Sequence, residues 1–188
     1  MAAGVGDYQG KCRDGALHAF GTARIFEQRA NRLKRKTDVL TWVGLVVPLL
    51  IGALVGTFGK NKLWGLVITI AAVIAAVQLA MNLWSLIRRW REELSYSSGS
   101  AAANDSLATR YTALADGPPA LATLRAQFEK LEVEDISRRD RDGEKGVTEK
   151  ERRMGMRPTL RKYQRPCGAC LAVPTTMDPS ACGVCGQF

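Results

Sequence analysis

Two long runs without a charged side chain dominate the pattern of apolar and polar positions along this chain. They cover residues 39–59 and 63–87, and only the Lys-Asn-Lys sequence at 60–62 separates them. A helix needs about 20 residues to cross a bilayer core of roughly 30 Å, and both runs reach that length. The pattern predicts an all-α membrane protein with a two-helix transmembrane hairpin over 39–87. A helical hairpin in a soluble core is the alternative, but such helices usually show a polar stripe and are shorter.

Basic and aromatic residues at the ends of the two runs predict the orientation of the hairpin. Six Lys or Arg side chains lie in residues 24–36, before the first run, and three lie in 88–91, after the second. Cytoplasmic flanks carry such an excess of basic residues, so both termini are expected in the cytoplasm and 60–62 on the far side. Tryptophans favour the headgroup layer, and all four lie at or just beyond the ends of the runs: Trp42, Trp64, Trp84 and Trp90.

The segments on either side of the hairpin are predicted to be cytoplasmic helices. Residues 1–38 contain a basic helix, expected from about Asp14 to Asp38, with a seam of small apolar side chains spaced three and four residues apart. This seam packs either within the chain or between chains. Residues 88–139 are expected to form further helices, weakened by the Ser-Ser-Gly-Ser sequence at 97–100 and stopped by Gly-Pro-Pro at 117–119.

The net charge of +9 is concentrated outside the two apolar runs. Residues 140–165 are almost wholly polar, with charges of both signs, and predict a flexible charged linker. Both this segment and residues 1–38 carry more basic than acidic side chains. Attraction to anionic membrane lipid explains such charge, and nucleic acid or another anionic partner is the alternative.

Two C-x-x-C sequences near the end of the chain, separated by eleven residues, carry the most specific chemical signal. Four thiolates in this pairing can surround one tetrahedral Zn²⁺, with each tight turn supplying two ligands. A reducing cytoplasm favours metal over disulfides, and iron–sulfur ligation and redox chemistry are the alternatives. The sequence thus predicts a small zinc ribbon over 166–188 with one structural zinc per chain, bound by Cys167, Cys170, Cys182 and Cys185.

Small and polar side chains mark the faces on which the two apolar helices are expected to pack. Small residues recur at multiples of four positions in both runs: Gly44, Gly52, Gly56, Ala72, Ala76 and Ala80. This spacing permits close helix contact, either inside one hairpin or between the copies of a homo-oligomer. A short polar stripe lies on the second helix: Gln78, Asn82 and Ser85. It either forms interhelical hydrogen bonds or lines a water-filled path in an assembly of several hairpins.

No group of residues in the sequence points to catalysis. His18 is the single histidine, and there is neither a serine-nucleophile motif nor a glycine-rich phosphate loop. A four-cysteine metal site has no open coordination position for water or substrate. Cys12, the fifth cysteine, is expected to be a free thiol. The chain is therefore not expected to be an enzyme.

The order of these features resembles that of the mobilome CxxCx(11)CxxC proteins, through CGAC at 167–170, CGVC at 182–185 and the eleven residues between them. Residues 12–115 are also similar in layout to the SLATT family of bacterial two-transmembrane effectors, with an Arg-rich helix, a hairpin with a minimal turn and a trailing helical region. The first resemblance implies a place among mobile-element and defence genes. The second implies an inner-membrane protein that oligomerises and permeabilises the membrane when a nucleotide-sensing partner detects infection.

Two functions are therefore expected. In the first, the chain is an inner-membrane effector or accessory protein of a bacterial mobile element or antiviral defence system, and its hairpins oligomerise to perturb the membrane. The zinc tail then receives a signal or a cytoplasmic partner, such as a defence-system sensor. In the second, the hairpin is only an anchor in membrane lipid, and the zinc ribbon with its basic linker binds protein or nucleic acid.

Overall fold

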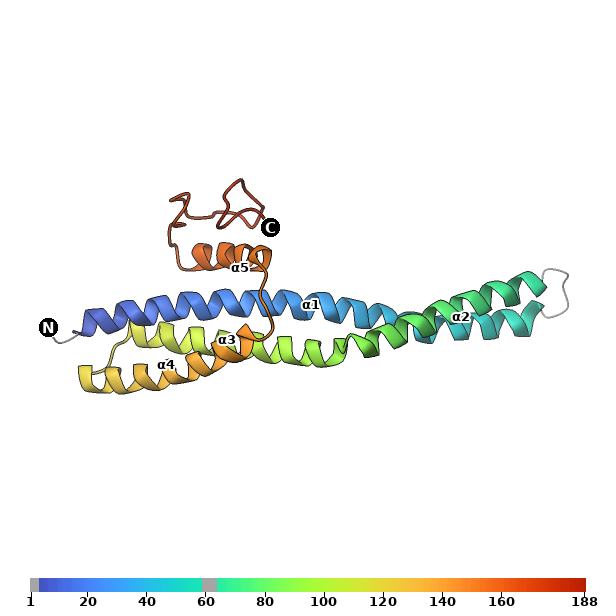
Figure 1. Cartoon of the computed structure of the whole chain (residues 1–188), viewed down its shortest axis with the longest axis horizontal. Coiled ribbons are helices and arrows are strands. Elements are labelled where there is room, and N and C mark those ends of the chain that lie inside the picture. The colour runs from blue at the N-terminus through green and yellow to red at the C-terminus, as the bar shows by residue number, and fades with distance from the viewer. Residues whose placement is uncertain (1–3, 59–63) are drawn as a thin grey trace. The chain divides into compact units, whose positions relative to one another are not determined.

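The computed structural model describes residues 4–58 and 64–188, and five helices form in that part of the chain (Figure 1). In chain order they are α1 (Val5–Phe58), α2 (Trp64–Ile87), α3 (Trp90–Asp116), α4 (Leu121–Gly143) and α5 (Glu149–Lys162). The prediction of an all-helical chain is confirmed for these residues, and the turn predicted at 60–62 lies outside them. The chain divides into two compact units, unit 1 (Met1–Gln28 with Ser97–Phe188) and unit 2 (Arg29–Tyr96).

Unit 1 has its hydrophobic core where the first half of α1 packs against α3 and α4. Tyr111 of α3 and Phe128 of α4 place their rings 6.2 Å apart in this core. Tyr111 lies so close to α1 that a methyl group on Gly15 would be 3.0 Å from its ring. The predicted seam on α1 is buried in this unit, with four of its members at most 2% exposed: Ala16, Ala19, Ala23 and Phe26. Ala16 and Ala19 belong to the core itself. The part of the seam that lies in unit 1 therefore packs within the chain.

Helix α3 continues through the Ser-Ser-Gly-Ser sequence at 97–100, so the weakening expected there is wrong. The reason is a buried polar cluster. Ser100 and Asn104 donate hydrogen bonds of 2.7 Å to the two carboxylate oxygens of Asp142, at the end of α4. These tertiary contacts outweigh the low helix propensity of serine and glycine. The break in the helix lies earlier, where Arg89 adopts a φ of 49° between α2 and α3.

The segment predicted to be a flexible linker, 140–165, instead contains the end of α4 and the whole of α5. Gly146 makes the turn between these helices with a φ of 56°, a conformation that favours glycine. Thr148 then caps α5: its hydroxyl accepts the backbone N–H of Glu151, and the Glu151 carboxylate accepts the backbone N–H of Thr148. This capping box satisfies two N–H groups that the first turn of a helix otherwise leaves unpaired.

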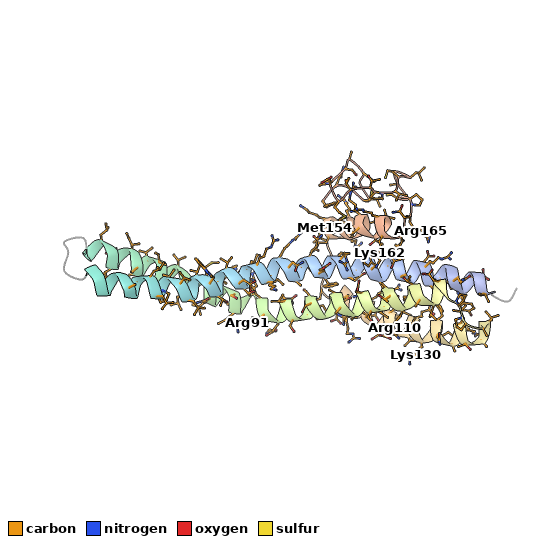
Figure 2. All side chains as sticks on the ribbon, turned by 180° about the vertical axis from the view of Figure 1, so that it is seen from behind. Arg91, Arg110, Lys130, Met154, Lys162 and Arg165 are labelled. Atoms are coloured by element: carbon orange, nitrogen blue, oxygen red, sulfur yellow. The ribbon has the colours of Figure 1, made fainter. Side chains whose placement is uncertain are left out.

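Helix α5 is held against α1 at a pair of glycines. A methyl group on Gly155 would lie 2.8 Å from the carbonyl oxygen of Gly21 and 2.7 Å from the Ile25 side chain, so only glycine permits this crossing. The ammonium group of Lys162 lies 3.8 Å from the centre of the Phe20 ring and adds a cation–π contact. Figure 1 shows α5 alongside the first half of α1, and Figure 2 labels Lys162 on α5. The polar composition of the segment hides these contacts.

Unit 2 comprises the second half of α1, α2 and the start of α3. Helices α1 and α2 are long and apolar enough to cross a membrane, and the most apolar window of each is 0% buried. The equivalent helix of a soluble core is mostly buried. Many large apolar side chains of this unit are exposed, and several are more than 60% exposed: Leu45, Leu49, Leu79 and Leu86.

Candidate metal centre

The four cysteines of the C-x-x-C sequences converge in the structure. All four sulfur atoms lie within 4.8 Å of one another. The Sγ atoms of Cys167 and Cys182 are 3.9 Å apart, and those of Cys170 and Cys185 are 3.8 Å apart. In a tetrahedral site with metal–sulfur bonds of about 2.3 Å, the sulfurs are about 3.8 Å from one another. The cluster therefore has the dimensions to hold one metal ion.

Backbone hydrogen bonds fold each C-x-x-C sequence into a tight turn. In the first turn the N–H of Leu171 donates to the carbonyl of Cys167 at 2.8 Å. In the second the N–H of Gly186 donates to the carbonyl of Cys182 at 3.0 Å. Gly186 also packs on Ser180, and a methyl group on it would be 2.5 Å from the Ser180 carbonyl oxygen. The tail has no strand among its described residues, so hydrogen-bonded turns rather than a β-hairpin position the ligands.

The electrostatics of the cluster differ between its thiols. Hydrogen bonds from the backbone N–H groups of Val184 and Cys185 lower the pKa of Cys182 to about 6. Burial raises the pKa of Cys185 to about 12. A buried thiolate is costly without a positive charge beside it, and a bound cation supplies that charge to all four sulfurs. This donor set therefore favours a divalent metal.

Arg157 of α5 fastens the metal centre to the helix, and the sequence reasoning missed it. Its buried guanidinium donates to the carbonyls of Thr176 at 2.9 Å and Cys185 at 3.2 Å, and to the Ser180 hydroxyl at 3.3 Å. Leu160, one turn further along α5, packs against Cys167 and Cys185. The capping sequence Thr148-x-x-Glu151 could have predicted the start of α5, the helix that carries Arg157. No local sequence pattern predicts the hydrogen-bond partners of Arg157.

In unit 2 the structure brings one pair of the predicted packing residues together. A methyl group on Gly44 of α1 would lie 2.9 Å from the amide nitrogen of Gln78 on α2. Gly52 has no other atom within 4 Å of the position of such a methyl group. Gly56 falls among the side chains outside the described part. The other predicted residues lie on α2, where all are exposed except the half-buried Ser85: Ala72, Ala76, Ala80, Asn82 and Ser85. Their predicted roles stay predictions.

Comparison with known proteins identifies the family. The family model described as mobilome CxxCx(11)CxxC protein matches residues 9–188. The chain belongs to this family. The match covers the helices of both units as well as the cysteines, so the family is defined by more than the four-cysteine tail. No curated protein and no solved structure matches the chain. The similarity in layout to SLATT effectors remains a prediction.

Proposed function

We propose that this mobilome CxxCx(11)CxxC protein is an inner-membrane protein of a bacterial mobile element or defence system, with unit 2 spanning the bilayer and both termini in the cytoplasm. The exposure of the apolar side chains of unit 2 carries this proposal. Burying a leucine or isoleucine is worth about 1.5–3 kcal/mol, and more than ten such side chains of unit 2 are exposed. A lipid bilayer provides the apolar surroundings that the described part of the chain does not.

We propose that the four-cysteine cluster holds one structural Zn²⁺. Sulfur separations near 3.8 Å, paired C-x-x-C turns and a reducing compartment all favour zinc. Four protein ligands close the coordination sphere, so the ion stabilises the tail and its contact with α5, and we expect no enzymatic activity. Elemental analysis of the purified chain should find one zinc per chain. Much less zinc, or the absorption band of an iron–sulfur cluster, would reject this assignment.

We propose further that the hairpins associate into a homo-oligomer that perturbs the membrane, and that unit 1 receives the activating partner. The two glycines of the first apolar helix support this division. Gly44 is used inside the hairpin, against Gln78, whereas Gly52 has an open face that a second copy can approach closely. The activating partner is a cytoplasmic sensor or another anionic partner, because α5 is rich in exposed basic side chains.

A matched pair of substitutions tests the oligomer. Replacing Gly52 with leucine adds bulk on the open face, so the variant should insert normally but lose crosslinking between copies, membrane depolarisation and toxicity together. Gly65 of α2 also has open space around it and lies outside the stripe, so Gly65→Leu should behave as the unchanged protein. A potential-sensitive dye, crosslinking and growth are read in the same cells. Unchanged toxicity of Gly52→Leu, or toxicity without depolarisation, would reject the effector.

The second candidate function is a membrane-tethered binding module. The contact between Gly44 and Gln78 favours it, because the first residue of the polar stripe is then engaged inside one hairpin instead of facing water. In this function the hairpin is only an anchor, and the metal-binding tail with its basic helix binds protein or nucleic acid. Replacing Gln78 with leucine separates the two candidates: it should reduce ion conductance in the effector and leave the tethered module active.

A further inference from the structure

We propose that a cavity of about 490 Å³ in unit 1 binds a small phosphorylated molecule with an apolar body, a role that goes beyond the membrane function above. The cavity lies between α1, the end of α4, the connection at 144–148 and α5, so every wall belongs to unit 1. Pockets for small ligands typically measure about 300–1,000 Å³ and are lined by apolar groups with a few polar ones. This cavity matches that description.

The walls of the cavity are held in place without a ligand. The close crossing of Gly21 and Gly155 fixes α5 against α1. On the other side, the hydrogen bonds from Ser100 and Asn104 to Asp142 fix the end of α4. The capping box at Thr148 fixes the start of α5. A preformed cavity binds with little loss of conformational entropy, which favours a specific ligand site over a surface depression.

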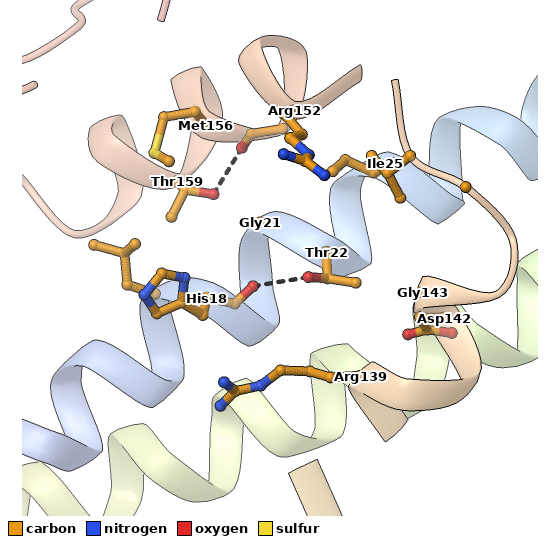
Figure 3. Close-up of a pocket in the computed structure, with 14 residues that line it drawn as sticks. His18, Gly21, Thr22, Ile25, Arg139, Asp142, Gly143, Arg152, Met156 and Thr159 are labelled. Atoms are coloured by element: carbon orange, nitrogen blue, oxygen red, sulfur yellow. Dashed lines mark hydrogen bonds between the residues drawn. The ribbon is translucent and has the colours of Figure 1, made fainter. Parts of the chain in front are cut away.

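The charged side chains that the lining leaves for a ligand are hydrogen-bond donors. Asp142 is the single acidic residue of the lining, and both of its oxygens already accept hydrogen bonds inside the protein. The hydroxyls of Thr22 and Thr159 donate to carbonyls of their own helices, as Figure 3 shows, so each offers a ligand only an uncharged acceptor oxygen. The side chains of the lining that can still donate to a ligand are the charged Arg139 and Arg152 and the imidazole of His18. A group rich in acceptors is the natural complement of this lining.

Three donor side chains from three helices favour a phosphate group. Figure 3 shows His18 on α1, Arg139 on α4 and Arg152 on α5 around the pocket. Arg139 uses Nε and Nη2 to hold Asp135, and Arg152 uses Nη1 to hold Glu149, so each guanidinium keeps further N–H groups. A carboxylate is planar with two oxygens, whereas a phosphate presents three oxygens in different directions. The phosphate can therefore meet donors from several walls at once.

Apolar side chains form much of the remaining lining, and they favour an apolar body on the ligand beside its phosphate group. Leu17 and Ile25 of α1, Val147 of the connection and Met156 of α5 contribute apolar surface to the cavity. Inorganic phosphate alone would leave this surface against water. The structure thus assigns the site to a phosphate ester whose body is apolar enough to gain from burial there.

The test uses the full chain in a neutral detergent and equilibrium dialysis with the same detergent on both sides. The probe is 1-naphthyl phosphate, compared with neutral 1-naphthol and inorganic phosphate. We expect the naphthyl phosphate to bind at least tenfold more tightly than either control. Arg152→Gln should weaken its binding at least tenfold, whereas Arg161→Gln, an exposed position on the same helix outside the cavity, should not. Equal binding of 1-naphthol would overturn the proposal.

A second pair of variants tests the location of the binding site without changing any charge. Gly143 lines the cavity and Gly99 does not, and a methyl group on either meets no atom within 4 Å. Gly143→Trp should abolish binding and Gly99→Trp should preserve it, with melting temperatures checking that both fold. Competition by hexyl phosphate or by dihexanoyl phosphatidic acid tells whether the natural ligand is a soluble phosphate ester or a lipid headgroup. Competition by neither, or binding unchanged in Gly143→Trp, would refute the site.

Discussion

At the scale of single residues, the geometry of the four-cysteine cluster depends on contacts that the cysteines themselves do not reveal. In the second C-x-x-C sequence, Gly183 follows Cys182 and Gly186 follows Cys185, but the two glycines differ in their surroundings. Gly186 packs against the backbone and hydroxyl of Ser180, whereas Gly183 has open space around it. A side chain at position 186 would therefore clash, whereas one at position 183 would not, although both glycines belong to the same turn.

This difference gives a prediction with its own control. Gly186→Ala places a methyl group 2.5 Å from the Ser180 carbonyl oxygen, so the turn must shift and its two sulfurs must move. We expect zinc affinity to fall at least tenfold, which corresponds to about 1.4 kcal/mol. Gly183→Ala should keep its affinity within about twofold. Competition with a chromophoric chelator measures both, and equal affinities would contradict the prediction.

The guanidinium of Arg157 gives a second prediction. Lysine keeps the charge but cannot reach the three acceptors that Arg157 holds, so Arg157→Lys should destabilise the metal-bound tail by about 1.5–3 kcal/mol. Arg161→Lys, at an exposed position of the same helix, should have no effect beyond about 0.5 kcal/mol. The rate of zinc transfer to a chelator reports the difference. Similar rates in the two variants would show that Arg157 does not hold the tail.

The sequence predicted that the four cysteines come together, and it missed Arg157 for a physical reason. Each C-x-x-C pair is a local pattern, because one tight turn sets the distance between its two sulfurs. The carbonyl partners of Arg157 lie 19 and 28 residues further along the chain. Composition and periodicity carry no information about contacts across such separations. The same holds for Gly44 and Gln78, whose contact needs two helices to be placed before it can be recognised.

At the scale of elements, α5 is a helix in a segment whose composition predicted a flexible linker. Its surface is strongly charged, and its buried face consists mainly of small or polar residues: Met154, Gly155, Arg157, Thr159 and Leu160. Such a face gives a weak apolar signal, although it packs closely because glycine lets two backbones approach. The long apolar runs of α1 and α2 were predictable because length and absence of charge are properties of the sequence itself.

The close approach of α5 and α1 gives a third prediction. Gly155→Ala would bring a methyl group to 2.8 Å from the Gly21 carbonyl oxygen, so α5 must move away at a cost of about 1–3 kcal/mol. Gly99→Ala, in the open interior of α3, should instead stabilise the chain by about 0.5–1 kcal/mol. Thermal unfolding followed by circular dichroism should therefore shift in opposite directions. A higher melting temperature for Gly155→Ala would contradict this packing.

At the scale of the whole molecule, the proposed membrane topology places most of the described chain on one side of the bilayer. In this proposed topology, unit 1 and the charged ends of unit 2 share the cytoplasmic compartment, and the sequence at 60–62 is the external point. The excess of basic residues beside the inner ends is the reason for this orientation.

Cysteine labelling tests the topology. A cysteine at Asn61 should react with a membrane-impermeant maleimide in intact cells, and one at Ser106, exposed on α3, should react only after permeabilisation. Ser100 would be a poor choice, since its side chain is buried against Asp142. The native Cys12 should stay silent, because it is buried and burial raises the pKa of its thiol. Labelling at Ser106 but not at Asn61 in intact cells would invert the proposed orientation.

The division of unit 1 between the two ends of the chain has a consequence for its biosynthesis. Residues Met1–Gln28 leave the ribosome first, but their packing partners begin only at Ser97, after all of unit 2. The seam on α1 must wait for α3 and α4, and Gly21 must wait for Gly155, which is synthesised later still. A product cut short by a premature stop would therefore expose the seam. Quality-control proteases can remove such chains, so the copies that persist have both parts of unit 1 packed together.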